Sequence, residues 1–342
     1  MKITYHKFYE EFHCVASKCS DSCCKEWDVV IDDQSSELYE NVGGEFGEKL
    51  RSAMITDSDG DRIFTLQNNC CPFWNKDRLC DIYINLGEAA LCETCRRFPR
   101  IVLNYTSFEE RILSLACPEA LRLMLHKGAM QSLVVRETSE PPEPCDYDEN
   151  IMELLIAARK EIFSAINDGK STIFDCINAI YKICGSVQSR LNGEEITCDF
   201  NINGDSVILS YQNTITTLLS LDIMTDEWRA LLENARQYAP AVSDISAFQG
   251  YIADYGYEYK NLAFYYVFRY FINAIDSYDV LGCFKLLLLA VKSAYVLHLY
   301  LFSQSLNLSD GQRHRVIGLY SKEVEQSYEN ISAIANRSLD EI

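Results

Sequence analysis

The chain has 342 residues, of which 48% are hydrophobic and 24% are charged, a balance typical of a soluble globular protein. Its formal net charge of −19 would repel phosphate backbones, so nucleic acid is not expected as a partner. The acidity would attract a lysine-bearing protein, although its simplest role is to keep the chain soluble.

The N-terminal residues 1–12 contain no apolar run and no cleavage site, so no secretory signal is predicted and we expect a cytoplasmic protein. Cytosolic thiols stay reduced, so the fifteen cysteines of this chain favour metal binding or catalysis over disulfides. Ten of them precede residue 120, and the other five are scattered singly: Cys145, Cys176, Cys184, Cys198 and Cys283.

The first cysteine cluster has the spacing C-x4-C-x3-CC and is followed by Trp27. Its members are Cys14, Cys19, Cys23 and Cys24. Thiolates three or four positions apart lie on one side of a turn or helix, so several of them can converge on one metal atom or cluster. The cluster therefore predicts a metal site.

Short elements are expected to follow. Residues 28–32 and 62–67 have the composition of short strands, and residues 35–54 predict one or two short helices broken at Gly43 and Gly44. A second group of cysteines then occupies residues 70–117 and comprises Cys70, Cys71, Cys80, Cys92, Cys95 and Cys117.

The spacing leaves the metal open between iron and zinc. Zinc favours Cys-x2-Cys pairs, often with histidine, and only Cys92 and Cys95 form such a pair here. All-thiolate ligation suits an iron–sulfur cluster, of which 4Fe–4S is the expected form. The spacing differs from the CxxxCxxC of radical enzymes that cleave S-adenosylmethionine, because Glu26 occupies the third position after Cys19 and Cys23.

An acidic, proline-containing segment at 137–150 reads as a linker. Apolar residues with helical periodicity follow it, whereas 196–209 alternates weakly and predicts a hairpin or a loop. The predicted helices cover 150–166, 171–191, 226–238, 259–275, 280–306 and 309–339. The most apolar stretch, 286–302, contains Lys292 and His298, so a buried core helix is expected there and no membrane insertion.

These elements predict a mainly α fold. An irregular cysteine-rich metal-binding domain would cover 1–136, the linker 137–150, and an α-helical domain 151–342.

Several segments together resemble the flagellin lysine-N-methylases. The first, FHCVASKCSDSCCKEWDVVID (12–32), is similar to the opening of that family, and CPFWNKDRLCDIYINLGEAALCETCRRFPR (71–100) and SLACPEALRL (114–123) are similar to its later cysteine segments. A fainter likeness joins NLAFYYVFRYFINAI (261–275) and LYSKEVEQSYENI (319–331) to the FRYF-containing and late helices of the family.

The resemblance implies methyl transfer from S-adenosylmethionine to lysine side chains of flagellin by an enzyme with an iron–sulfur cluster. It also implies eight cysteine ligands: Cys14, Cys19, Cys23, Cys24, Cys71, Cys80, Cys95 and Cys117. Gln326 stands where the family usually has histidine, which would impair or retune the activity if that histidine acts in the chemistry. The residues alone predict only the metal site, and no G-x-G-x-x-G cofactor loop is present.

Such a reaction needs a neutral lysine, whose ordinary pKa is about 10.4. Tyr266 and Tyr270 could flank the amine, although an apolar core stripe is the interpretation we favour for their helix. Three arginines are candidates to hold the cofactor carboxylate: Arg96, Arg100 and Arg269. Glu323 and Glu325 could act as a base or guide the lysine, although a solvated helix face is the interpretation we favour, and no catalytic residue is assigned.

Two other classes of function remain open. One is a non-catalytic zinc- or iron-binding interaction module, in which the helices serve as a docking surface. The other is an iron–sulfur protein that only carries electrons.

Overall fold

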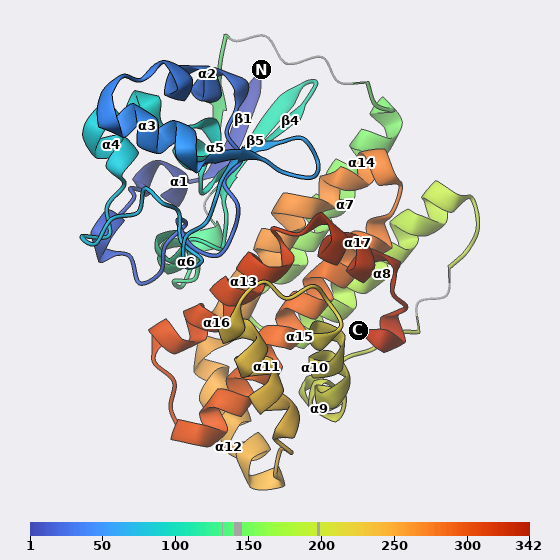
Figure 1. Cartoon of the computed structure of the whole chain (residues 1–342). Coiled ribbons are helices and arrows are strands. Elements are labelled where there is room, and N and C mark those ends of the chain that lie inside the picture. Colours follow the sequence, from blue (N-terminus) through green and yellow to red (C-terminus); the bar gives the residue numbers. More distant parts are fainter. Residues whose placement is uncertain (132, 140–145, 197–198) are drawn as a thin grey trace.

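The computed structural model describes residues 1–131, 133–139, 146–196 and 199–342, and helices dominate it (Figure 1). The prediction of a mainly α fold is therefore confirmed for the described residues. Cys145, Cys198 and the middle of the predicted linker lie outside them.

Short helices and a small two-stranded sheet form the cysteine-rich part of the chain, of which only the helices within 35–54 and the strand within 62–67 were predicted. These elements are α2 (Asp33–Asn41), α3 (Gly44–Ala53), β2 (Met54–Thr56), β3 (Arg62–Phe64), α4 (Asp81–Leu86) and α5 (Glu93–Arg97). The expected break at Gly43 and Gly44 is confirmed, and Gly44 has a φ of 71°, which favours glycine. The strand predicted at 28–32 is wrong, because that segment makes only an isolated bridge between Val30 and Ile63.

A four-stranded sheet was not predicted. Its order is β4–β5–β1–β6, with the strands β4 (Arg100–Tyr105), β5 (Phe108–Leu113), β1 (Lys2–His6) and β6 (Leu133–Glu137). Strand β1 runs parallel to β5 and antiparallel to β6, so the first residues of the chain lie in the middle of the sheet. The short helices α1 (Phe8–Glu11) and α6 (Pro118–Met124) follow β1 and β5.

The helices of the second half largely match the prediction. They are α7 (Glu149–Ile166), α8 (Ile173–Asn192), α9 (Gly204–Leu209), α10 (Tyr211–Leu219), α11 (Asp226–Gln237), α12 (Val242–Ile252), α13 (Gly256–Tyr270), α14 (Ala274–Ser277), α15 (Val280–Ser305), α16 (Asp310–Val324) and α17 (Tyr328–Asn336). Of the hairpin or loop expected at 196–209, the described residues 199–203 form a loop, whereas 204–209 form α9. The single helix expected at 309–339 is two helices, since the Ser327 side chain caps α17.

Helix α15 is long and apolar enough to cross a membrane by length and composition, with a mean hydropathy of 1.9 over its best window. However, 83% of that window is buried inside the protein, as expected for a core helix. Lys292 and His298 are both buried, and the side chain of His298 is bonded to Tyr259 at 2.7 Å and to the carbonyl of Arg313 at 3.0 Å.

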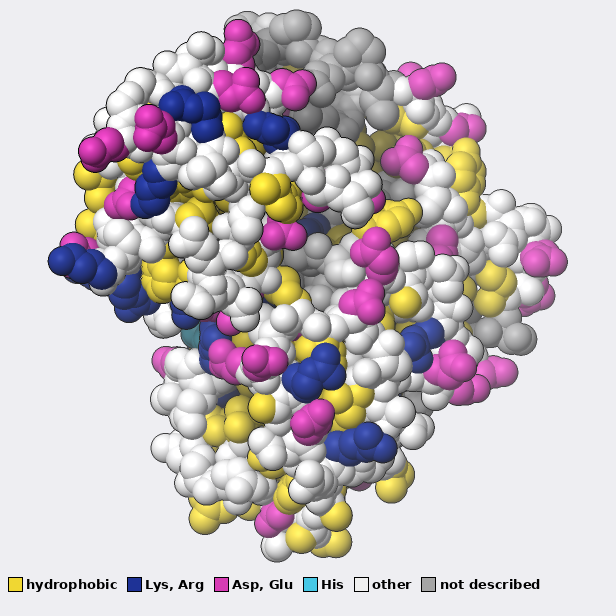
Figure 2. All heavy atoms as spheres, viewed as in Figure 1, with side chains coloured by type: hydrophobic (Ala, Val, Ile, Leu, Met, Phe, Trp, Pro, Cys, Tyr) yellow, Lys and Arg dark blue, Asp and Glu magenta, His cyan; other side chains and the backbone are white. Residues whose placement is uncertain are grey.

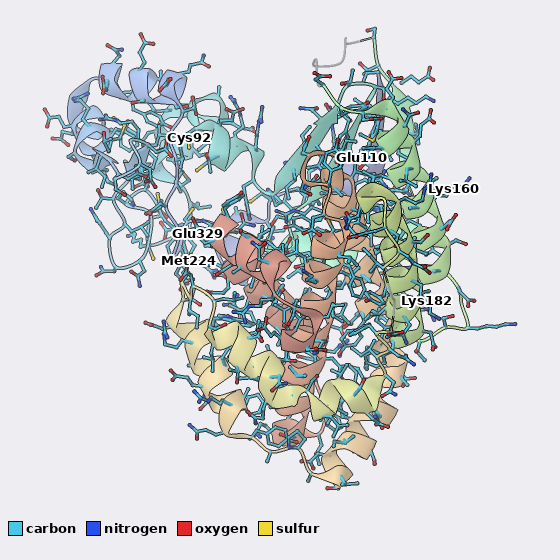
Figure 3. All side chains as sticks on the ribbon, turned by 90° about the vertical axis from the view of Figure 1, so that its right-hand side faces the viewer. Cys92, Glu110, Lys160, Lys182, Met224 and Glu329 are labelled. Atoms are coloured by element: carbon cyan, nitrogen blue, oxygen red, sulfur yellow. The ribbon has the colours of Figure 1, made fainter. Side chains whose placement is uncertain are left out.

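The boundary expected at 137–150 does not coincide with a division between hydrophobic cores. One large core joins the sheet and α6 to the helices of the second half, and a separate small core lies within residues 29–92. Arg159 of α7 and Glu110 of β5 form a buried ion pair, and Figure 3 shows Glu110 where the sheet meets α7. The cysteine-rich segment projects from the part of the protein that contains the large core. Asp and Glu side chains are spread over the face of the molecule seen in Figure 2.

Candidate active site and metal centre

The structure brings cysteines from distant segments together in two neighbouring groups. The first group contains Cys14, Cys19, Cys23 and Cys117. Burial, together with a smaller effect of the nearby thiols of Cys19 and Cys14, raises the pKa of the Cys117 thiol to about 11. Cys117 lies at the start of α6, almost a hundred residues after the others, so this group depends on the tertiary fold.

The second group contains Cys24, Cys71, Cys80, Cys92 and Cys95. Burial, together with a smaller effect of the thiols of Cys24, Cys80 and Cys92, raises the pKa of Cys71 to about 12. Backbone contacts fix the arrangement, because the amide of Cys71 donates to the carbonyl of Cys24 at 2.8 Å. Cys23 and Cys24 are adjacent in sequence and therefore link the two groups. A hydrogen bond from Cys23 lowers the pKa of Cys24 to about 7.

All eight cysteines that the sequence suggested as ligands fall into these two groups. Cys92 joins them, although it is not among the eight ligands that the resemblance implies, and its Cys-x2-Cys spacing to Cys95 could have indicated its place. Within the described residues, no three Cys, His, Asp or Glu side chains converge on a position for a single metal ion. The donor set is nevertheless chemically suited to a polynuclear iron–sulfur cluster, whose thiolate ligands bind different iron atoms and stand further apart.

Charged side chains attach the first cysteine segment to α16. The Lys322 ammonium lies 2.8 Å from the Glu26 carboxylate and 3.6 Å from that of Asp21, and it lies over the Trp27 ring at 5.1 Å. Arg315 contacts Asp21 at 2.8 Å. Burial acts to raise the pKa of Asp21, but the hydrogen bond from Arg315 and the charge of Lys322 outweigh it and hold the pKa below its ordinary value.

Other segments that carry the family resemblance meet at the same place. Trp27 packs edge-on against Phe98, with ring centroids 5.4 Å apart, so the first and second cysteine segments touch. Gln326, directly after α16 ends, donates to Ser114 at 3.4 Å, which lies just before Cys117. The C-terminal end of α16 is thus in contact with two distant parts of the sequence, and the first of them in turn contacts Phe98.

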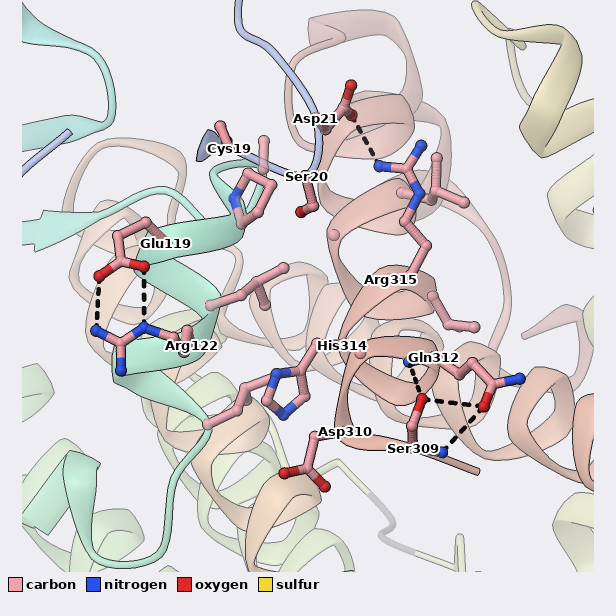
Figure 4. A pocket seen from close by; sticks show the side chains of 18 of the residues that line it. Cys19, Ser20, Asp21, Glu119, Arg122, Ser309, Asp310, Gln312, His314 and Arg315 are labelled. Carbon is pink, nitrogen blue, oxygen red and sulfur yellow. Dashed lines mark hydrogen bonds and ion pairs between the residues drawn. The ribbon is translucent and has the colours of Figure 1, made fainter. Parts of the chain in front are cut away.

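A cavity of about 980 Å³ lies beside the first cysteine group (Figure 4). It is lined by residues 15–21, by α6 and by the N-terminal half of α16, and Cys19 reaches its wall. Its lining mixes both charges, because Glu119 pairs with Arg122 and Asp21 pairs with Arg315. A cavity of this size, with polar groups on several sides, can hold a cofactor-sized molecule.

A second polar cluster is buried between α13 and the end of α16. Glu325 is 5% exposed and accepts hydrogen bonds from Tyr265 and Tyr270, both at 2.9 Å, and from Arg269. The solvated helix face expected for Glu325 and Glu323 is therefore wrong. Glu323 is 2% exposed and its carboxylate accepts the backbone amides of Met224 and Thr225 at the start of α11.

The three arginines suggested for a cofactor carboxylate lie in different surroundings. Arg269 is occupied by its ion pair with Glu325. Arg100 lies over the rings of Tyr9 and Phe12. Arg96 is exposed on α5 beside Cys95. The structure does not bring these arginines into one site, and their role in cofactor binding stays a prediction.

Comparison with known proteins identifies the family to which this chain is similar. Residues 148–341 match the family described as the FliB lysine N-methylase C-terminal domain. Over 138 residues, 36% of this chain, the sequence is 32% identical to Flagellar biosynthetic protein FliU of Salmonella muenchen, covering 77% of that protein. It is 30% and 31% identical to the Lysine-N-methylases of Salmonella typhimurium and Salmonella choleraesuis, and again 36% of this chain is matched. The matched region spans about a third of those two proteins (32% of each). No solved structure matches the chain.

Proposed function

Because the chain belongs to the FliB lysine N-methylase family, we propose that it transfers methyl groups from S-adenosylmethionine to lysine side chains of flagellin. The names of the relatives support lysine as the acceptor and a role connected with the flagellum. One observation about this chain carries the proposal further: the cysteine segments and the late helix that together resemble the family meet at the end of α16.

The proposed reaction is a displacement at the methyl carbon. The lone pair of a neutral lysine amine forms a new N–C bond while the C–S bond of the sulfonium breaks and its electron pair remains on sulfur. The methylated nitrogen then carries a positive charge and releases one proton to water. Because lysine is mostly protonated near neutral pH, the protein must favour its uncharged form by removing water or accepting a proton.

The two cysteine groups are the proposed ligands of an iron–sulfur cluster. When bound, such a cluster would supply an iron site for the methyl donor or a covalent staple for the irregular cysteine-rich segment. The chain's own contribution is to hold this segment against α16 through Lys322 and Arg315.

We place the methyl donor in the cavity of Figure 4, because this cavity adjoins Cys19 and offers carboxylates and guanidinium groups to a zwitterionic ligand. Filling the cavity tests the assignment. The substitution Gln312→Trp should abolish binding of S-adenosylmethionine by anaerobically purified protein in calorimetry. Gln304→Trp places the same side chain at an exposed position at the end of α15, outside the cavity lining, and should leave binding unchanged. Equal binding by both variants would contradict the assignment.

A further inference from the structure

Three buried polar atoms lie near one another between α13 and α16 without a hydrogen-bond partner among the described residues. They are Oε1 of Glu325 and the hydroxyls of Tyr266 and Tyr320. These side chains belong to residues that are at most 5% exposed. An unsatisfied buried polar group costs about 1–3 kcal/mol, and native proteins contain few of them, so several in one cluster point to a missing ligand.

The two oxygens of Glu325 differ in their surroundings. Oε2 accepts from Tyr265, Tyr270 and Arg269, whereas Oε1 is the unpartnered atom. The missing partner must therefore offer at least one N–H or O–H donor to Oε1. The phenol oxygen of Tyr266 or Tyr320 can accept a hydrogen bond from a second N–H of the same ligand, because a phenol both donates and accepts. A group with two N–H donors on one nitrogen meets both requirements.

Charge decides which nitrogen group fits. Arg269 already balances the charge of Glu325 at 2.5 Å, and the other titratable groups around the carboxylate are tyrosines. A cation would enter a site with no net negative charge and would lose its hydration, which disfavours the charged form of an amine. An uncharged primary amine loses little on entry and keeps its lone pair free.

Aromatic rings pack around these atoms. The rings of Tyr266 and Tyr270 are stacked with centroids 5.6 Å apart, and Tyr265 packs edge-on against Tyr266 at 5.4 Å. Such walls suit the methylene chain of an aliphatic amine. Gln326, the residue after Glu325, contacts Ser114 three residues before Cys117.

We infer that this cluster binds the uncharged amine of the target lysine, with its N–H groups donated to Glu325 Oε1 and to a tyrosine oxygen. The inference rests on the proposed function for the identity of the amine. The amine-binding property itself can be tested without the reaction. Tyr266 and Tyr270 were favoured as edges of an apolar core from the sequence, but the burial of Glu325 beside them adds a polar ligand site.

The test uses n-butylamine as a probe and the full-length chain, with tyrosine NMR signals as the readout at pH 9, where some of the amine is uncharged. Tyr266→Phe and Tyr320→Phe remove unpartnered hydroxyls, so both variants should fold at least as well as the parent. The variant that lacks the accepting tyrosine oxygen should weaken butylamine binding about five- to tenfold, the effect of one lost hydrogen bond. Tyr211→Phe is the matched control, because that hydroxyl bonds the carbonyl of Ala235 elsewhere.

Methyl transfer to flagellin provides the second readout. The variant that weakens butylamine binding should also raise the KM for flagellin while the affinity for S-adenosylmethionine stays constant. Unchanged butylamine affinity and unchanged KM in both variants would overturn the inference and leave ordered water as the occupant. Butylamine binding that depends on these tyrosines in a parent protein without transferase activity would uphold the amine site and contradict the proposed function instead.

Discussion

Lys322 and Glu26 form an ion pair with 2.8 Å between nitrogen and oxygen, although 296 residues separate them in the sequence. Lys322 is 3% exposed, and its ammonium also faces Asp21 and the Trp27 ring. The contact fixes the segment that carries Cys23 and Cys24 to α16, which couples the cysteine groups to the helical body.

Replacing this lysine should loosen that connection. Lys322→Met leaves Glu26 without its partner in a partly buried position, so we expect the free energy of unfolding to fall by about 2 kcal/mol, less than for a fully buried pair. Urea unfolding measures the change. Lys7→Met removes an exposed ion pair with Glu11 and should have no measurable effect. Equal stability of the two variants would show that Lys322 does not hold the segment.

The cysteine groups predict which thiols hold metal. Serine at Cys19, Cys23, Cys71 or Cys95 should lower the iron and sulfide content of anaerobically purified protein, because each removes one thiolate of the proposed cluster. Serine at Cys176 or Cys283 should not, since these thiols donate to the carbonyls of Ala165 and Tyr270. Equal loss from both sets would refute the division, and stoichiometric zinc in a colourless protein would refute the iron–sulfur assignment.

A buried histidine predicts a loss of stability in acid. Burial lowers the pKa of His6 to about 3, and its ring lies among Phe8, Phe264 and Phe268 with both nitrogens unpartnered in the described structure. In the unfolded chain, His6 binds a proton below the ordinary histidine pKa of about 6.5, whereas in the folded chain it stays uncharged down to about pH 3. The free energy of unfolding therefore falls as the pH falls from 6.5 towards 3. Between pH 6.5 and 5 this amounts to about 2 kcal/mol.

His6→Phe should remove that dependence and raise stability at neutral pH, because it replaces two unpartnered nitrogens by carbon. His298, whose pKa burial lowers to about 4, keeps a similar dependence in both proteins. Urea unfolding at pH 7 and pH 5 measures the difference. His13→Phe, at an exposed position, serves as the control. A pH profile that is the same for His6→Phe and the parent would contradict the assignment.

The side chain at position 326 is expected to affect the rate of methyl transfer. It contacts Ser114 at 3.4 Å between the buried tyrosine cluster and Cys117, at a position where the family resemblance implies histidine. Gln326→His should raise the rate of methyl transfer to flagellin without changing metal content, if an imidazole there assists proton release. Gln304→His, on the exposed end of α15, is the matched control. No gain in rate would show that position 326 has only a structural role.

Local patterns predicted the helices well because each pattern lies within one segment. Apolar periodicity placed α7, α8, α11 and α15 within a few residues of their observed bounds. The four-stranded sheet was missed because β1 pairs with strands about a hundred or more residues away, and short strands carry no local mark of their partners. The break after α16 could have been found from Ser327, which caps α17.

The sequence pointed to the cysteines that the fold brings together, and their role as metal ligands stays a prediction, whereas the sequence did not reveal that Glu325 and Glu323 are buried. Glu325 looks like a surface residue in a polar stretch, and only the arrival of Arg269, Tyr265 and Tyr270 from α13 shows that it is buried. The attachment of Asp21 and Glu26 to α16 likewise depends on residues near the opposite end of the chain. Burial of a charge is a property of the tertiary fold, which one sequence segment does not reveal.

The most direct test of the central claim is the reaction itself. Anaerobically purified protein is incubated with S-adenosylmethionine and the flagellin of its own organism, and lysine residues are examined by mass spectrometry. Methylated lysines on flagellin are expected, with transfer lost in Cys23→Ser and retained in Cys176→Ser. Absence of both cofactor binding and transfer from a protein that carries its full metal content would contradict the proposed enzyme and favour a metal-binding interaction module.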